Sequence, residues 1–218
     1  MNRLLDINVA QILIAFIVLL FSLTVHEAAH AWTADRLGDP TARLLGRVSL
    51  NPIVHADPIG TVLFPLLASV SGLPLIGWAK PVPVILSRLR RERKDYVLVA
   101  AAGPASNLLL AVAAAFALRA MPVSPATLGT MNVSAPIKSL AGRALEVNLL
   151  LAIFNMIPIP PLDGGNVVGG LLPSAAGRRF DAMIRPYGFI ILLILIFTRV
   201  VDIVVAPIIN AIVSVLLA

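Results

Sequence analysis

The sequence predicts an all-α polytopic membrane protein, and three observations support this fold class. Of the 218 residues, 59% are hydrophobic and only 13% are charged, and the mean hydropathy is +0.95. The apolar residues gather in runs long enough to cross a bilayer as helices, which takes about 20 residues each. The basic residues, which give a net charge of +6, lie in short segments between these runs. We therefore expect about four to six membrane segments in a single domain over residues 1–218, and no nucleic-acid partner.

The first spanning helix is expected from Asn8 to Leu37. Gly38 is typical of the residue that follows a helix C-terminus, and Pro40 lies just beyond it. A secretory signal peptide is the alternative, with "AHA" at 29–31 as its cleavage site. The apolar stretch is longer than the usual h-region of about 7–15 residues, and cleavage would discard the ionisable residues of this helix. We therefore interpret it as a membrane helix.

Two shorter segments precede the second span. Residues 43–50 alternate with a period of two, which predicts a short β-strand at the cytoplasmic surface. Residues 58–77 are apolar but are interrupted by Pro65, Gly72 and Pro74. Such a broken stretch is tolerated at membrane depth only where protein buries its backbone, so we expect a re-entrant hairpin.

Three further apolar stretches complete the expected membrane part. The second span is expected over residues 97–120 and the third over residues 137–157. A proline-broken stretch, "NMIPIPPLDGG" at 155–165, follows the third span. The fourth span begins near Tyr187 and bends at Pro207.

The distribution of lysine and arginine predicts which loops are cytoplasmic. Residues 121–136 contain neither and are expected outside. The basic residues expected on the cytoplasmic side are Arg36, Arg43, Arg47, Lys80, Arg88, Arg90, Arg91, Arg93, Lys94, Arg178, Arg179 and Arg185. If the hairpin returns to the side that it left, His26 and residues 158–165 both fall in the cytoplasmic half of the membrane.

The stretch "HEAAH" at 26–30 places ionisable groups inside the first helix, where they are costly and functional by default. His26 and His30 are one turn apart, a spacing at which two imidazoles bind one metal ion, with Glu27 beside them as a general base. Alternatively, they line a helix–helix contact. Catalytic zinc usually has three protein ligands, and Asp163 is the best candidate for the third because the topology places it at the same depth. Asp163 could instead cap the next helix.

These motifs together resemble the site-2 protease family of intramembrane zinc metalloproteases. The resemblance rests on "HEAAH", "GPASN" at 103–107 and "NMIPIPPLDGG", and the stretches at 51–61 and 77–84 are similar to those of short bacterial and archaeal members. The PDZ or CBS domains of larger relatives are not found. The resemblance implies that Zn²⁺ is bound by His26, His30 and Asp163. It also implies that Glu27 is the catalytic acid/base and that Asn155 holds the substrate backbone or the oxyanion.

Three other polar residues could have structural rather than catalytic roles. The Asn155 amide could make a helix-packing hydrogen bond. Asn107 follows small residues that suggest close helix packing, so we expect a structural role. His55 lies in "HADP" on a surface loop, and we favour a loop or gating role over metal ligation because the ligand set is already filled.

The resemblance implies an intramembrane zinc endopeptidase that cleaves membrane proteins near the cytoplasmic face. We expect a multi-pass protein of a prokaryotic cell membrane, whose partners are the lipid bilayer and a single-span substrate. A strand at 43–50 would offer an edge on which an unwound substrate segment could pair. The alternative is a membrane metal-ion transporter, since transporters also combine ionisable residues with broken helices. No inverted repeat is visible, however, and a transporter does not need the HExxH order.

Overall fold

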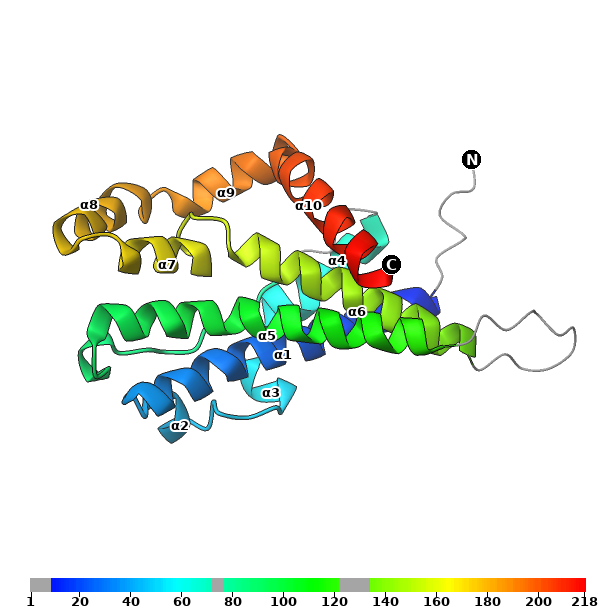
Figure 1. Ribbon diagram of the computed structural model, residues 1–218, viewed down its shortest axis with the longest axis horizontal. Helices are drawn as coiled ribbons and strands as arrows, with labels where there is room; N and C mark the ends of the chain where they lie inside the picture. The colour runs from blue at the N-terminus through cyan, green and yellow to red at the C-terminus, as the bar shows by residue number, and fades with distance from the viewer. Residues whose placement is uncertain (1–8, 72–76, 122–133) are drawn as a thin grey trace, which may run out of the picture.

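The computed structural model describes residues 9–71, 77–121 and 134–218, and the regular structure of these residues is entirely helical. Three long helices, α1 (Val9–Leu37), α5 (Glu92–Ala120) and α6 (Ser134–Asn155), pack against one another (Figure 1). The shorter elements are α2 (Thr41–Leu44), α3 (Pro52–His55), η1 (Pro58–Leu63), α4 (Phe64–Ser71), η2 (Leu86–Arg88), α7 (Asp163–Leu171), α8 (Ser174–Ile184), α9 (Gly188–Phe197) and α10 (Val200–Leu217). The predicted all-α class is confirmed for the described residues.

Small and branched apolar side chains fill the contacts among the three long helices. One buried cluster joins α1 to α6 and contains Val18, Leu19, Leu23, Ala79, Val147 and Leu151. A second joins α5 to α6 and contains Ala111, Ala114, Ala115, Leu145 and Leu149. The alanines of α5 let the two helix backbones approach closely, as is usual for helix pairs in membranes.

Two helices of the described chain, Ala10–Leu37 and α5, are long and apolar enough to cross a membrane. A third crossing results if α8 and α9, which meet at 62°, form one span. The predicted third span is a helix, α6, but its first half carries Lys138, Arg143 and Glu146, which make it too polar to qualify by composition. The protein is thus a membrane protein, and the predicted count of about four to six segments is not confirmed.

The helix α1 ends as the sequence predicts, at Gly38. This glycine has a φ of +117°, in the left-handed region that favours glycine. The Asp39 N–H donates to the Ala34 carbonyl at 2.9 Å, and the Gly38 N–H donates to the Asp35 carbonyl at 3.3 Å. These are the two hydrogen bonds of a Schellman motif, which satisfy carbonyls that the end of a helix leaves free.

The predicted strand at residues 43–50 is wrong. The helix α2 occupies the start of this segment and ends at Leu44, and Gly46, two residues beyond, has a φ of +69°. A second Schellman motif closes it, since the Arg47 N–H donates to the Ala42 carbonyl at 2.8 Å and the Gly46 N–H donates to the Arg43 carbonyl at 2.9 Å. The left-handed glycine turns the chain, so the alternating side chains never line up along an extended backbone. Substrate pairing on an edge at 43–50 loses its basis.

The segment 58–77 begins and ends at neighbouring positions in the fold. On the outgoing side, η1 and α4 form a short helical pair. On the returning side, the Trp78 N–H donates to the Gly60 carbonyl at 3.1 Å, and the Lys80 N–H donates to the His55 carbonyl at 2.8 Å. The two ends of the segment therefore lie side by side, as a hairpin requires. Its expected breaks at Gly72 and Pro74 lie outside the described residues.

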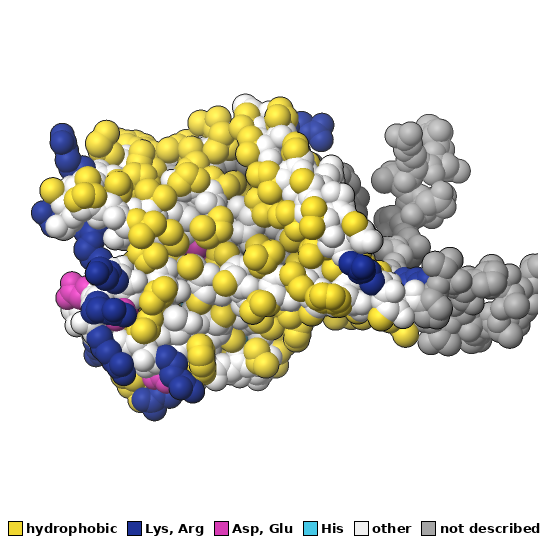
Figure 2. All heavy atoms as spheres, viewed as in Figure 1, with side chains coloured by type: hydrophobic (Ala, Val, Ile, Leu, Met, Phe, Trp, Pro, Cys, Tyr) yellow, Lys and Arg dark blue, Asp and Glu magenta, His cyan; other side chains and the backbone are white. Residues whose placement is uncertain are grey.

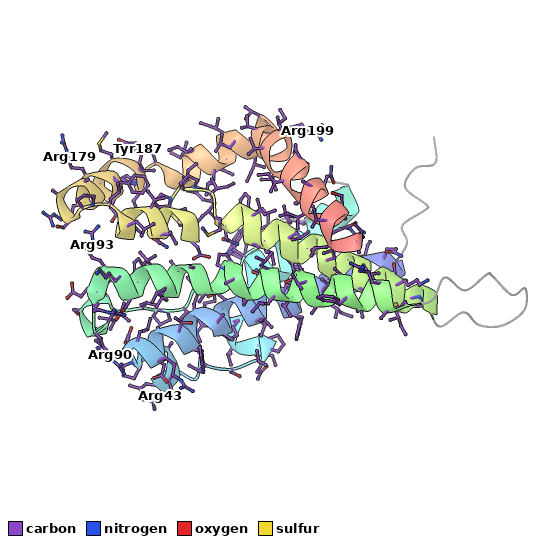
Figure 3. All side chains as sticks on the ribbon, viewed as in Figure 1. Arg43, Arg90, Arg93, Arg179, Tyr187 and Arg199 are labelled. Carbon is purple, nitrogen blue, oxygen red and sulfur yellow. The ribbon has the colours of Figure 1, made fainter. Side chains whose placement is uncertain are left out.

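Lysine and arginine side chains gather at one end of the molecule (Figure 2). Arg43, Arg90, Arg93 and Arg179 all lie at this end, which carries α2, α8 and the start of α5, whereas Arg199 lies far from it (Figure 3). Loops that the charge pattern assigned to one side of the membrane thus share one end of the fold.

Candidate metal centre

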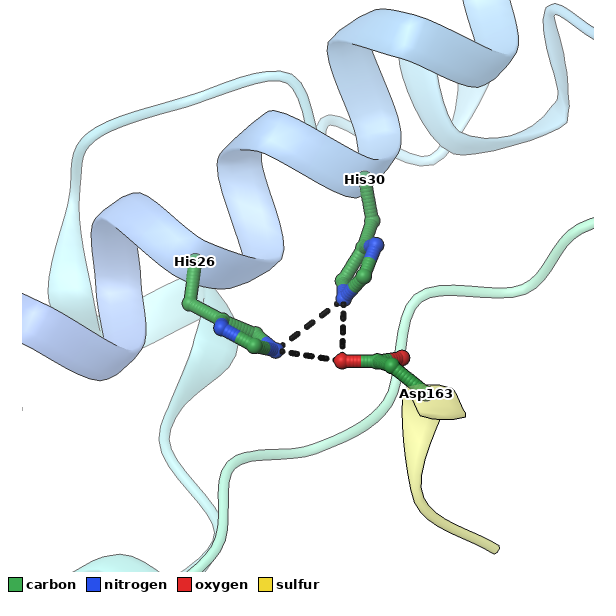
Figure 4. Close-up of side chains that lie close together, drawn as sticks. All are labelled: His26, His30 and Asp163. Carbon is green, nitrogen blue, oxygen red and sulfur yellow. Dashed lines mark hydrogen bonds and ion pairs between the residues drawn. The ribbon is translucent and has the colours of Figure 1, made fainter. Parts of the chain in front are cut away.

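The imidazoles of His26 and His30 point from α1 into the helix bundle. They are buried, with exposed fractions of 4% and 8%. Because the two residues are four apart on the helix, their side chains lie on one face. Their Nε2 atoms are 3.0 Å apart (Figure 4).

Asp163, far away in the sequence, completes the group. Its Oδ2 atom lies 3.1 Å from the His26 Nε2 and 3.4 Å from the His30 Nε2 (Figure 4). One potential ligand atom from each of the three residues lies within 4.8 Å of the other two. The structure therefore brings together the three residues that the sequence predicted as ligands.

Hydrogen bonds to α5 determine which ring nitrogens face this group. The His30 Nδ1 lies 2.7 Å from the Val99 carbonyl, which can only accept, so this nitrogen is the donor. The His26 Nδ1 donates to the Asn107 Oδ1 at 2.6 Å. In the neutral rings the Nε2 atoms therefore carry lone pairs, and both lone pairs are available to a metal ion.

Gly103 of α5 makes room for the two rings. A Cβ atom at this position would lie 2.4 Å from the His30 Nε2 and 2.6 Å from the His26 Cε1, closer than real Cβ contacts allow. The glycine in "GPASN" is therefore required by the close approach of α5 to the imidazoles.

The loop before α7 delivers Asp163 to the histidines. Two glycines let the chain fold back on itself, because a Cβ on Gly164 would lie 2.3 Å from the Met156 carbonyl oxygen and one on Gly165 would lie 2.3 Å from the Pro160 nitrogen. The N-cap residue of α7 is Leu162, and no side chain caps the helix. The alternative role of Asp163 as a helix cap is therefore wrong.

Arg93 of α5 holds the other end of α7. Its Nη2 donates to the Gly169 carbonyl at 2.6 Å and to the Leu172 carbonyl at 2.8 Å. These carbonyls lie at the C-terminus of α7, where a cation is favourable. A Cβ on Gly170 would lie 2.4 Å from the Val97 Cγ2, so α7 packs directly on α5. Arg93 thereby fixes the helix that begins with Asp163.

The donor set fits a zinc ion. The Asp163 Oδ2 is buried and makes no hydrogen bond, although both Nε2 atoms are near it. Two nitrogen lone pairs and a carboxylate oxygen repel one another unless a cation lies among them. Two histidines and a carboxylate are also a known ligand set of catalytic zinc, which keeps a further position open for water or substrate.

Glu27 follows His26 on α1 and is half-buried. Its Oε2 accepts a hydrogen bond from the Val82 N–H at 3.1 Å. The segment that contains Val82 therefore lies against α1 beside the histidines.

The structure does not bring Asn155 into the metal-ligand group. Its Nδ2 donates to the Leu151 carbonyl of its own helix at 2.9 Å, so its role at the oxyanion stays a prediction. His55 is buried outside the group, and its Nε2 lies 2.9 Å from the Ser49 carbonyl. His55 is the last residue of α3 and is not on a surface loop, so that expected placement is wrong, and its gating role stays a prediction.

Sequence reasoning missed how directly Asn107 serves the site. The residue is fully buried, and besides accepting from His26 it donates to the Asn148 Oδ1 at 2.9 Å. It therefore both packs the helices, as expected, and orients a candidate ligand. The overlooked signal is the spacing of Val99, Gly103 and Asn107, which are four residues apart and so form one line along α5 that faces α1.

An HExxH helix whose two histidines meet a distant aspartate defines the site of a zinc metalloprotease. The model of peptidase family M50 matches residues 120–198, which contain Asp163. The chain is 38% identical over 195 residues to YwhC of Bacillus subtilis (strain 168), a protein that carries the name of a zinc metalloprotease. The matched residues cover 89% of this chain and 85% of that protein.

Two mycobacterial proteins named in the same way are also similar. Rip2 of Mycolicibacterium smegmatis is 34% identical over 182 residues, which cover 82% of this chain and 64% of Rip2. Rip3 of Mycobacterium tuberculosis is 31% identical over 156 residues, 72% of this chain and 30% of Rip3. No solved structure gives a significant match. The chain belongs to peptidase family M50 and is a zinc metalloprotease, so the resemblance to site-2 proteases is confirmed.

Proposed function

We propose that the protein is an intramembrane endopeptidase that cleaves transmembrane segments of single-span membrane proteins near the cytoplasmic face of a prokaryotic cell membrane. The observation that carries the proposal is the place of the metal-ligand group. His26 and His30 lie within α1, a helix long and apolar enough to cross a bilayer. The basic end of the molecule lies at the end of α1 that is nearer to the histidines, and basic loops favour the cytoplasm.

The side chains around the ligand group have distinct roles in this proposal. His26, His30 and Asp163 would hold zinc, which would supply a Lewis acid and make water a better nucleophile near neutral pH. The Glu27 carboxylate accepts a proton from the attacking water and passes it to the leaving nitrogen. The Asn155 amide, once it releases the Leu151 carbonyl, donates to the negative charge that develops on the scissile carbonyl oxygen.

Helical substrates hide their peptide bonds within their own hydrogen bonds, so a cleaved segment must unwind locally. The burial of the two histidines means that such a segment has to approach between helices rather than from an open surface. The chain that enters and leaves the hairpin is joined at its base by the Trp78–Gly60 hydrogen bond, and we propose that η1 and α4 beyond this bond move to admit the segment.

The test compares zinc content and cleavage in purified protein. Wild type should hold about one zinc per chain and cut a single-span substrate reconstituted with it. Asp163→Ala should lose both zinc and cleavage. Glu27→Gln should keep zinc and lose cleavage, whereas a metal transporter that uses the same residues would lose or weaken zinc binding. Cleavage by wild type outside the membrane segment of every substrate would contradict the intramembrane proposal.

A further inference from the structure

A strap of the chain, residues 78–82, crosses α1 beside Glu27. Prolines at 81 and 83 flank Val82 and favour an extended backbone there. Because proline has no N–H, Val82 provides the only main-chain donor of this three-residue stretch. That donor is used on Glu27, at 3.1 Å from its Oε2.

Arg47 anchors the strap next to this contact. Its exposed fraction is 6%, and within the described chain it forms no ion pair with a carboxylate. Its Nη2 donates to the Pro81 carbonyl at 3.3 Å and to the Lys80 carbonyl at 3.4 Å, and its Nη1 donates to the Val54 carbonyl. Burying a guanidinium costs free energy unless its N–H groups form hydrogen bonds. Here these groups donate to main-chain carbonyls of the strap and of the preceding loop.

Further main-chain contacts hold the strap on both sides. At its first residue, the Trp78 N–H donates to the Gly60 carbonyl at 3.1 Å. After it, the Ile85 N–H donates at 2.6 Å to the carboxylate of Asp39, which is fully buried. The strap is therefore fixed in register against α1, and the height of the Val82 N–H is fixed with it.

A fixed hydrogen-bond donor can hold the side chain of a glutamate that transfers protons in one orientation. A free glutamate samples several rotamers, and ordering it costs side-chain conformational entropy. A hydrogen bond from a rigid N–H to the charged carboxylate selects one rotamer. Because this bond holds Oε2, the orientation of the whole carboxylate, including Oε1, is fixed with it.

We propose that the strap is a positioning element for the catalytic base, and that Arg47 is a positioning residue that acts on Glu27 through the Val82 N–H. The inference rests on the role of Glu27 in the proposed function. It extends that function to residues outside the ligand group and the base.

The first experiment removes only the donor. Val82→Pro deletes the N–H, and Val84→Pro is the matched control, because the Val84 N–H makes no hydrogen bond to the described residues. Fluorescein-labelled casein serves as a general endopeptidase probe. We expect kcat to fall about tenfold in Val82→Pro, with KM and zinc content unchanged, since small misplacement of a reacting group costs rate rather than binding. Val84→Pro should keep the wild-type kcat.

The second experiment removes the anchor. Arg47→Met should lower kcat to a similar extent, and Arg47→Lys, which still donates to carbonyls, should restore part of it. Arg43→Met is the control, because the Arg43 side chain is exposed and pairs with Asp35 away from the strap. Hydrogen exchange measured by mass spectrometry should accelerate at the strap amides in Arg47→Met and not in Arg43→Met.

Two results would overturn the proposal. One is an unchanged kcat in Val82→Pro at full zinc content. The other is faster exchange of the strap in Arg47→Met without a loss of kcat, which would mean that the contact is structural only. Failure of the proposed function looks different, because zinc-loaded wild type would then cut no substrate within its membrane segment, whatever the variants do to kcat on casein.

Discussion

The histidine half and the aspartate half of the metal centre are built in different ways. His26 and His30 sit on one continuous helix, and single contacts from α5 orient each ring. Asp163 begins a short helix after a proline-broken loop, and its position depends on close packing at Gly164 and Gly170 and on Arg93. One half is therefore fixed by local helix geometry, and the other by tertiary contacts along the whole of α7.

This difference predicts where the site is vulnerable. A change near the histidines acts on ligand atoms directly, so its effect on zinc binding should be large and local. A change at the far end of α7 reaches Asp163 only through the position of a helix, so its effect should be smaller and should appear in the zinc dissociation rate.

The largest effect is expected for Gly103→Ala. The new Cβ would lie 2.4 Å from the His30 Nε2, so an imidazole has to move out of the group. We expect zinc content to fall below about a tenth of the wild-type value, because binding needs all three ligands together. Gly142→Ala is the control, since a Cβ there meets nothing within 4 Å. Full zinc content in Gly103→Ala would show that the rings have more freedom than the structure implies.

The next effect is expected for Asn107→Leu, which keeps the side-chain volume and removes the partner of the His26 Nδ1. Loss of such an outer partner typically costs about 10–100-fold in metal affinity. Competition with a chromophoric chelator measures this loss. Ser106→Ala is the neighbouring control, because among the described residues the Ser106 hydroxyl bonds only to the Gly103 carbonyl of its own helix. Equal zinc affinities in the two variants would show that the contact between Asn107 and His26 does not contribute to zinc binding.

A smaller effect is expected for Arg93→Gln in the aspartate half. The variant loses hydrogen bonds to the end of α7, each worth about 1–3 kcal/mol when the donor is charged. We expect zinc to dissociate roughly five to ten times faster, with stoichiometry unchanged. Arg90→Gln is the control, since the Arg90 side chain is exposed. If Arg93→Gln weakened zinc binding as much as Asn107→Leu, the two halves would not differ as described.

The smallest effect concerns the end of the histidine helix and its response to pH. Burial tends to raise the pKa of Asp39, but hydrogen bonds from the Ile85 and Thr41 N–H groups and the Thr41 hydroxyl, with the charge of Arg88, hold the pKa below its ordinary value of 3.8. A lowered folded pKa means that this carboxylate stabilises the fold above about pH 4 and loses that effect as the pH falls further.

Thermal unfolding in detergent between pH 6 and pH 3 measures this contribution. Asp39→Asn should lower the midpoint by roughly 2–4 °C at pH 6. The difference between wild type and variant should shrink towards pH 3. A constant difference over this range would mean that the Asp39 charge does not contribute.

The two halves also differ in what the sequence predicts of them. The histidine pair follows from a spacing of four on an apolar helix, which is local information. Asp163 required a topology inferred from charge, and its glycines and Arg93 acquire meaning only when α7 is folded back on α5. The error at residues 43–50 has the same origin. A period of two indicates a strand only if the backbone stays extended, and Gly46 turns it.

Asn107 shows a further limit. Its residue type and its small neighbours correctly predicted close helix packing, but packing and ligand orientation use the same buried amide. A sequence gives no measure of which partner lies across a helix contact. The strap carries the same lesson, because Val82 has an unreactive side chain and contributes through its main chain.

The length of α1 beyond the histidines sets the distance between the metal centre and the end of the helix. Leu37, the last residue of the helix, lies seven positions after His30, which corresponds to about 10 Å along the helix axis. The segment just past that end carries the exposed Arg43 and the exposed apolar side chains of Leu44, Leu45, Leu50 and Ile53, a mixture suited to the boundary between headgroups and acyl chains. If the protein cleaves within the membrane as proposed, this boundary keeps the metal centre at a constant depth, and the bond cut in a substrate is then selected by its distance from the water.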